Sequence, residues 1–183
     1  MRIRFFPLVR EVVVPGFELC FHNRSTMPPI TALLHTFNDG LRLGRALETL
    51  RACDELLVID HGSTDNSLHV AREYGATVRD GYAPEQSSRF AANLWVLCVL
   101  PSESVSESLE SSLYEWKSYS ENDVTRIAAC SMFVRKETDS GWEESTPETR
   151  LVRRDWVEWN GALPRESRAS MLLQGDLRRF RRP

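Results

Sequence analysis

Two apolar segments of strand length, each followed by a polar turn and an amphipathic helix, constrain the fold of this chain most strongly. The first segment is Ile30–Thr36 and the second is Glu55–Asp60. Ile30–Thr36 is apolar on both faces, as expected of a strand buried within a parallel sheet. The helix between them is marked by one apolar stripe: Leu43, Ala46, Leu47 and Leu50. The order predicts a parallel α/β sheet with right-handed crossovers.

The pattern continues less regularly toward the C-terminus. A second helix is expected to end at Gly75, before strands over Ala76–Arg79 and Trp95–Leu100. The serines between positions 102 and 120 belong either to a flexible linker or to the solvated face of a helix. We favour the helix because it carries an apolar stripe: Val105, Leu109, Leu113 and Trp116. Beyond it we expect a strand over Ile127–Val134 and a hairpin that turns at Arg154-Asp155.

Length and charge exclude several classes of protein. A chain of 183 residues with 42% hydrophobic and 27% charged residues is large enough for one compact domain. Its net charge of −3 gives no electrostatic case for nucleic acid as a partner. No apolar run approaches the roughly 20 residues that cross a bilayer. The N-terminus has no uninterrupted apolar core of a signal peptide, so we expect a cytoplasmic protein.

We divide the chain into three parts. Residues 1–26 form an N-terminal extension, which is either an edge strand or poorly ordered, and residues 27–168 form a single domain. Residues 169–183 are expected to be a basic C-terminal tail. Such a tail is either a solvated terminus or a segment that binds phosphate or acidic lipid, which would associate the protein with a membrane surface.

Polar residues gather where three of the expected strands end. These segments are Thr36-Phe37-Asn38-Asp39, Asp60-His61-Gly62-Ser63-Thr64-Asp65 and Leu100-Pro101-Ser102-Glu103. Parallel sheets bind ligands beyond the C-terminal ends of their strands, so these segments are candidates for a site. Asp65 fits a helix cap, whereas Asp60 directly ends a buried strand and is expected to point into the crevice. An alternative is a zinc site made by His35, His61 and Asp60.

In this order the segments resemble glycosyltransferase family 2, whose members have a Rossmann-like GT-A fold that binds nucleotide-diphospho-sugars. The family's T-[YF]-N-[ED] step is similar to Thr36–Asp39, and its D-x-G-S-T-D turn to Asp60–Asp65. The resemblance is strong from Ile30 to Val78 and patchier to about Glu166. It implies the transfer of a sugar from a nucleotide-diphosphate donor to an envelope glycan, such as lipopolysaccharide core, or to a lipid-linked acceptor.

The resemblance also assigns roles to the strand ends. Thr36, Asn38 and Asp60 would hold the nucleoside by hydrogen bonds. Phe37 would stack on the base, although an aromatic residue at this position also fits a core. Family members hold Mg²⁺ or Mn²⁺ on the diphosphate with a D-x-D motif after the fourth strand. Here the two aspartates align with Leu100 and Ser102, so Glu103 is the remaining candidate metal ligand.

Downstream motifs complete the expected site. The segment Glu148–Arg154 resembles the family's R-L-F-R segment, and Arg150 and Arg153 would neutralise the diphosphate. Glu166 is the candidate general base for the acceptor hydroxyl, or else an ordinary surface glutamate. Two functions remain: an active or weakly active glycosyltransferase, and a catalytically degenerate nucleotide-binding or assembly module.

Overall fold

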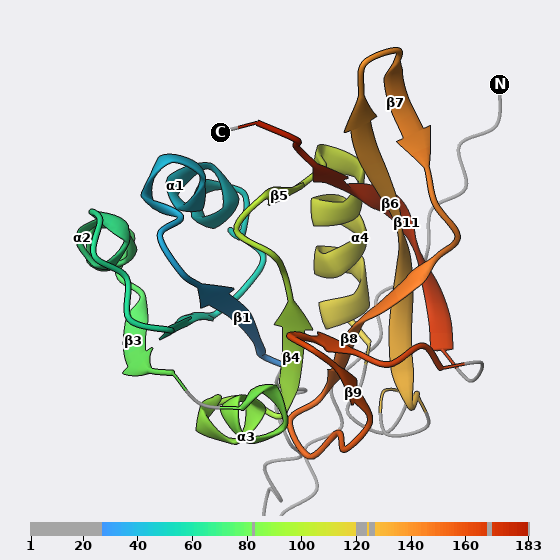
Figure 1. Cartoon of the computed structure of the whole chain (residues 1–183). Helices are drawn as coiled ribbons and strands as arrows, with labels where there is room; N and C mark the ends of the chain where they lie inside the picture. Colours follow the sequence, from blue (N-terminus) through green and yellow to red (C-terminus); the bar gives the residue numbers. More distant parts are fainter. Residues whose placement is uncertain (1–26, 82, 120–123, 125–126, 168–169, 183) are drawn as a thin grey trace, which may run out of the picture.

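The computed structural model describes residues 27–81, 83–119, 124, 127–167 and 170–182 (Figure 1). The expected N-terminal extension, residues 1–26, lies outside the described residues. Among the described residues no helix is long and apolar enough to cross a membrane. The described cysteines, Cys53, Cys98 and Cys130, carry free thiols.

The N-terminal half forms the predicted parallel sheet. Its strands are β1 (Ile30–Thr36), β2 (Glu55–Asp60), β3 (Thr77–Asp80) and β4 (Trp95–Cys98), in the spatial order β3-β2-β1-β4. All three pairings are parallel, and the last residues of β1 and β2, Thr36 and Asp60, are partners in the register. The expected bounds of β1 and β2 are confirmed, whereas β3 and β4 differ by one or two residues.

Two helices follow the first two strands. They are α1 (Gly40–Glu48) and α2 (Ser67–Glu73), which pack against each other (Figure 1). The chain leaves α2 through Tyr74 and Gly75, and Gly75 has a φ of 74°. Glycine adopts this left-handed conformation at little cost, so the predicted end of the second helix is confirmed.

The second half extends the same sheet with strands of both directions. The order continues from β4 as β8-β6-β11-β5, and β7 pairs with β6 in a hairpin that projects from the sheet (Figure 1). A separate two-stranded hairpin is made by β9 and β10. The remaining elements are α3 (Pro84–Ser87), a 3₁₀ turn (Ser88–Phe90), β5 (Glu103–Val105), α4 (Glu107–Lys117), β6 (Ala129–Thr138), β7 (Gly141–Glu144), β8 (Glu148–Arg153), β9 (Trp159–Asn160), β10 (Leu163–Pro164) and β11 (Ser170–Arg179).

Two expectations for this half are wrong. Arg154-Asp155 does not turn a hairpin, because β8 pairs with β4 and β6, and Trp159 instead pairs with Pro164 in the β9–β10 hairpin. The expected basic tail, residues 169–183, contains β11, which lies between β6 and β5. Leu173 and Leu177 of β11 are buried and form its apolar face. This face was not recognised in the sequence because arginines follow it closely.

The sheet separates two apolar clusters. On one face, alternate residues of β1, such as Ala32 and Leu34, pack with the buried side chains of α1 and α4. On the other face, Leu33 packs with Val96 of β4 and with the half-buried Trp159 of the β9–β10 hairpin. This hairpin therefore covers the sheet face opposite to α1, close to the strand ends that carry the candidate site.

Gly175 lets β11 pass against α4. Its φ is 94°, and a Cβ atom there would lie 2.3 Å from the backbone nitrogen of Leu109. The strand has an irregular register between Leu172 and Asp176, and the Asp176 backbone N–H donates to the Ser106 hydroxyl at the start of α4. Only a residue without a side chain fits at this crossing.

We predict that Gly175→Ala strongly lowers the free energy of unfolding. Both the left-handed φ and the overlap with the α4 backbone oppose a methyl group, and overpacking adds about 1–3 kcal/mol to the backbone cost. Gly75→Ala is the matched control, since Gly75 also has a positive φ but a Cβ atom added there would meet nothing within 4 Å. It should cost only about 1–2 kcal/mol. Equal losses in urea denaturation of the two variants would contradict the close approach.

Candidate functional site

The loops that follow β1 and β2 are joined by hydrogen bonds. Asn38 has a φ of 57°, and its side-chain oxygen accepts from the backbone N–H groups of Thr64 at 2.8 Å and Asp65 at 3.3 Å. The backbone N–H of Asn38 donates to the Ser63 hydroxyl at 3.0 Å. Asparagine tolerates the left-handed conformation better than most residues. Asn38 therefore holds the two loops in a fixed relative position.

Asp60 shapes the second loop. Its carboxylate accepts hydrogen bonds from the backbone N–H groups of Gly62 and Ser63, and from the Ser63 hydroxyl at 2.5 Å. The residue is 7% exposed. A ligand that approaches Asp60 meets a carboxylate whose position is already set by its own turn.

Asp65 lies one residue before Asn66, the N-cap residue of α2, and its carboxylate contacts the beginnings of two helices. One carboxylate oxygen accepts from the backbone N–H and hydroxyl of Ser67, and the other accepts from the Gly40 backbone N–H at 2.9 Å. These hydrogen bonds, led by that of the Ser67 hydroxyl, lower the pKa of Asp65. Asp65 thus ties the beginning of α2 to the beginning of α1.

The side chain of Phe37, the first residue after β1, is exposed to solvent. It is 60% exposed, whereas the preceding Thr36 is 1% exposed. The alternative that Phe37 belongs to the core is therefore wrong. An exposed ring at the end of β1 offers an aromatic face to a planar ligand.

His35 and His61 meet beside the same strand ends. The Nδ1 atom of His35 lies 2.9 Å from the Nε2 atom of His61, and the two rings are stacked. Burial, with a smaller contribution from His61, lowers the pKa of His35 to about 4. Asp60 is occupied by its own loop, and the described residues hold no group of three or more His, Cys, Asp or Glu side chains able to bind a metal ion. The structure does not support the zinc alternative.

The turn that follows β4, the third candidate segment, is closed by hydrogen bonds. The backbone N–H of Leu100 donates to the Glu103 carboxylate at 2.9 Å, and the Phe180 backbone N–H donates to the Ser102 carbonyl. Leu100 and Ser102 stand where the resemblance places metal-binding aspartates. Neither supplies a carboxylate, so the residues present at this turn do not fit a divalent cation.

Glu103 is the centre of a buried ion-pair cluster, which we define as Glu103, Glu148, Arg150 and Arg179. Both oxygens of Glu103 accept from Arg150, at 2.8 and 2.9 Å, and one also accepts from Arg179. The side chains of Glu103 and Arg150 are fully buried. A carboxylate enclosed by two guanidinium groups has no place for a cation, which corrects the expected metal role of Glu103.

The structure also corrects the expected diphosphate site. Arg150 is fully buried, and its guanidinium group is already paired with Glu103 and Glu148. Arg153 pairs with Asp155 and lies beside Trp95, at the beginning of β4. This is the opposite end of β4 from the candidate site.

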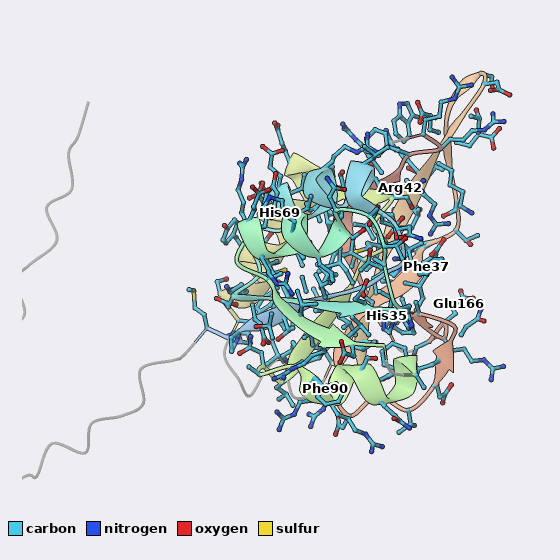
Figure 2. All side chains as sticks on the ribbon, turned by 60° about the vertical axis from the view of Figure 1, so that its left-hand side comes forward. His35, Phe37, Arg42, His69, Phe90 and Glu166 are labelled. Carbon is cyan, nitrogen blue, oxygen red and sulfur yellow. The ribbon has the colours of Figure 1, made fainter. Side chains whose placement is uncertain are left out.

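A cavity of about 280 Å³ lies beside the ion-pair cluster. The register Leu97↔Leu151 between antiparallel β4 and β8 carries the first residues of β8 past the end of β4. The cavity is therefore at the same sheet edge as the β1 and β2 loops, and Figure 2 shows Phe37, His35 and Glu166 on one side of the molecule. The cavity is lined by Thr146, Pro147, Glu148, Thr149, Arg150, Asn160, Leu163, Pro164, Arg165 and Glu166.

The cavity contains Glu166, as expected of a site residue, together with a carboxylate that sequence reasoning missed. Glu148 reaches the cavity while it binds Arg150. The only signal in the sequence was its place two residues before Arg150, within the segment that resembles the family motif.

We predict that Arg150→Met is strongly destabilising. The substitution leaves Glu103 charged and buried without its main partner, which typically costs about 3–5 kcal/mol. Arg135→Met is the control, because Arg135 forms a half-exposed ion pair with Glu144 and should contribute less than about 1 kcal/mol. Chemical denaturation of both variants measures the difference. A loss for Arg150→Met no larger than for Arg135→Met would contradict the structural role of the cluster.

His35 should make stability depend on pH. Its pKa is about 4 in the folded protein and 6.5 in an ordinary environment, so the unfolded chain binds more protons between these values. The free energy of unfolding should therefore fall as the pH is lowered through this window. His35→Asn should flatten that part of the profile in urea titrations, whereas the exposed His69→Asn should not. Parallel profiles for wild type and His35→Asn would refute the assignment.

Comparisons with known proteins find partial sequence matches to glycosyltransferases. No family model matches the chain. An uncharacterized glycosyltransferase of Rickettsia prowazekii is 32% identical over 91 residues, which are 46% of this chain and 31% of the relative. The lipopolysaccharide core biosynthesis glycosyltransferase LpsC of Rhizobium meliloti is 32% identical over 59 residues, covering 31% of this chain and 22% of that protein. The chain thus spans about a third or less of the length of these curated relatives.

Solved structures extend the likeness to the fold. The crystal structure of residues 1–349 of TarS from S. aureus aligns with a TM-score of 0.52 and 12% identity, over 82% of this chain and 57% of that chain. A glucosyl-3-phosphoglycerate synthase from Mycobacterium tuberculosis, solved with Mn²⁺ and UDP, aligns with a TM-score of 0.46 over 70% of this chain and 52% of that chain. The chain is thus similar in sequence to glycosyltransferases over less than half of its length, and its α/β fold is similar to that of TarS.

Proposed function

We propose that this chain acts in sugar transfer from a nucleoside diphosphate donor to a hydroxyl group of an envelope glycan or a lipid-linked acceptor. The observation that supports this most is the shared sheet edge. The exposed ring of Phe37 stands at one part of that edge, and the carboxylate-lined cavity lies at another. A donor held by its base at Phe37 would extend its diphosphate and sugar along the edge.

The β1 and β2 loops would bind the nucleoside. Phe37 would stack on the base, a contact worth about 1–3 kcal/mol. Among the described residues nothing accepts a hydrogen bond from the side-chain amide nitrogen of Asn38, which is left to donate to the ligand. Thr36 and Asp60 would act mainly by fixing the loops, with Asp60 also presenting its charge to the ribose.

The negative charge of the diphosphate would be neutralised by a protein side chain, because the Leu100–Ser102 turn would hold no metal ion. Arg165 lines the cavity, is exposed and has no carboxylate partner among the described residues. We therefore assign to Arg165 the role that the resemblance gave to Arg150 and Arg153. Membrane association through the C-terminal segment is not part of this proposal, because Arg178 and Arg179 are both engaged by carboxylates in β11 and the ion-pair cluster.

A second candidate function is a nucleotide-binding module that has lost catalysis. The closed turn at Leu100 and Ser102 favours it, since this turn offers no carboxylate to a metal ion. Both functions keep the nucleoside loops and differ in whether the bound donor is turned over.

We predict that UDP or GDP binds with an affinity that Phe37→Ala lowers by roughly tenfold or more, the loss expected for one base stack. Replacing Mn²⁺ by EDTA should change the affinity less than about threefold, because the turn holds no carboxylate ligand. Isothermal titration calorimetry measures both effects. Phe90→Ala is the control, since Phe90 is also exposed but lies away from Phe37 in Figure 2.

Turnover separates the two candidate functions. Release of nucleoside diphosphate is measured from UDP-glucose, UDP-N-acetylglucosamine and GDP-mannose, each with methyl glycosides as acceptors. Release above the uncatalysed rate supports a transferase, and binding without release supports the module. Failure of every nucleotide to bind would reject both.

A further inference from the structure

Glu148 is held by one of its two carboxylate oxygens. Its Oε2 atom accepts from the Arg150 Nε at 3.2 Å and Nη2 at 2.8 Å, and lies 3.5 Å from Arg179 Nη2. Among the described residues nothing donates to its Oε1 atom. The side chain is 29% exposed and lines the cavity. The protein therefore fixes the carboxylate in place and leaves one oxygen for something that enters the cavity.

Glu166 differs from Glu148 in this respect. It lines the same cavity but is exposed, and no hydrogen bond or ion pair holds its carboxylate among the described residues. Catalytic groups work best when packing and neighbouring hydrogen bonds fix them near the reacting geometry. Of the two carboxylates, Glu148 is the one that the structure preorganises.

The sheet register places Glu148 toward the donor. Leu151 is opposite Leu97, and Glu148 comes three residues earlier on an antiparallel strand. Glu148 therefore lies beyond Cys98, the last residue of β4. Arg150 donates to the Cys98 carbonyl, the last residue of β4, which fixes this alignment.

We propose that Glu148 is the general base of the transfer reaction, an inference that rests on the function proposed above. The acceptor hydroxyl would donate to Glu148 Oε1, which takes its proton. The acceptor oxygen then forms a bond to the anomeric carbon of the donor sugar. The bond from that carbon to the diphosphate breaks, and its electron pair leaves with the nucleoside diphosphate. Glu148 is the catalytic residue, and Arg150 and Arg179 are positioning residues.

The ion-pair cluster explains how a base can be fixed here. Arg179 is 25% exposed and contacts both Glu103 and Glu148, while Arg150 binds the same two carboxylates from the buried side. Two arginines and two glutamates balance in charge. Glu103 thus supports the catalytic carboxylate through the arginines that they share.

The decisive variant is Glu148→Gln, tested with the donor and acceptor panel described above. The glutamine oxygen can still accept from Arg150, so the variant should fold and bind UDP, with a melting temperature somewhat below that of wild type because the ion-pair cluster loses one negative charge. The turnover number should fall about 100-fold or more, the usual contribution of a general base. The loss of rate on the acid side of the wild-type pH profile should also disappear. Glu144→Gln, on the exposed β7, should behave as wild type.

Three outcomes decide the inference. Glu166→Gln should raise the KM of the acceptor while keeping the acid limb of the pH profile, and loss of that limb in Glu166→Gln alone would overturn the assignment of Glu148. If Glu148→Gln fails to fold, Glu148→Asp is measured instead. Glu148→Asp should still lose rate at acid pH, as wild type does, but with a lower turnover number throughout. An unchanged turnover number would also overturn the assignment of Glu148. Wild-type protein that binds UDP without releasing it from any donor overturns both the proposed transfer and this inference.

Discussion

The buried pairing of Glu103 with Arg150 is the interaction on which the second half of the structure depends. Each charge is fully removed from water, which costs several kcal/mol and is tolerated only because the two groups meet through both carboxylate oxygens. Burial acts to raise the pKa of Glu103, but the Arg150 guanidinium and its hydrogen bonds, with that of Leu100, outweigh burial and hold the pKa below its usual range. The pair joins β5 to β8, and Arg179 adds β11.

The same interaction explains why the two halves of the site differ. At the ends of β1 and β2, polar side chains shape open loops and leave Phe37 exposed. At the end of β4, the Glu103 carboxylate closes the turn by accepting from Leu100. Glu103, which resembled a remnant of a metal site, is thus a structural residue, and its arginine partners also hold the partly buried carboxylate of Glu148.

The sequence predicted those parts of the fold that local patterns determine. Strands β1 and β2 are apolar on both faces and bounded by polar turns, so even their ends were predictable. The end of α2 at Gly75 was predictable because one residue type fits the left-handed conformation there. Strand β11 was not, because its arginines indicate a solvated terminus unless Glu103, far away in the sequence, is known to bind one of them.

The candidate site divides in the same way. The two loops of the parallel half are short-range motifs, and the structure brings them together as expected. The roles of three other residues depend on how their strands pair within the sheet. These residues are Glu103, Arg150 and Arg153. No spacing in the sequence reveals that β8 lies antiparallel to β4, and this pairing decides that Arg150 is buried and that Arg153 lies at the far edge.

The position of β11 has a consequence for how the chain reaches its folded state. Ser170–Arg179 is inserted between β6 and β5, although it is made after both. During synthesis the edges of those two strands that face β11 stay unpaired until Ser170–Arg179 has left the ribosome. Pairings between segments so far apart in the chain form slowly, and exposed strand edges invite pairing with other chains. The chain is therefore expected to be most prone to aggregation in the interval between the synthesis of β6 and that of β11.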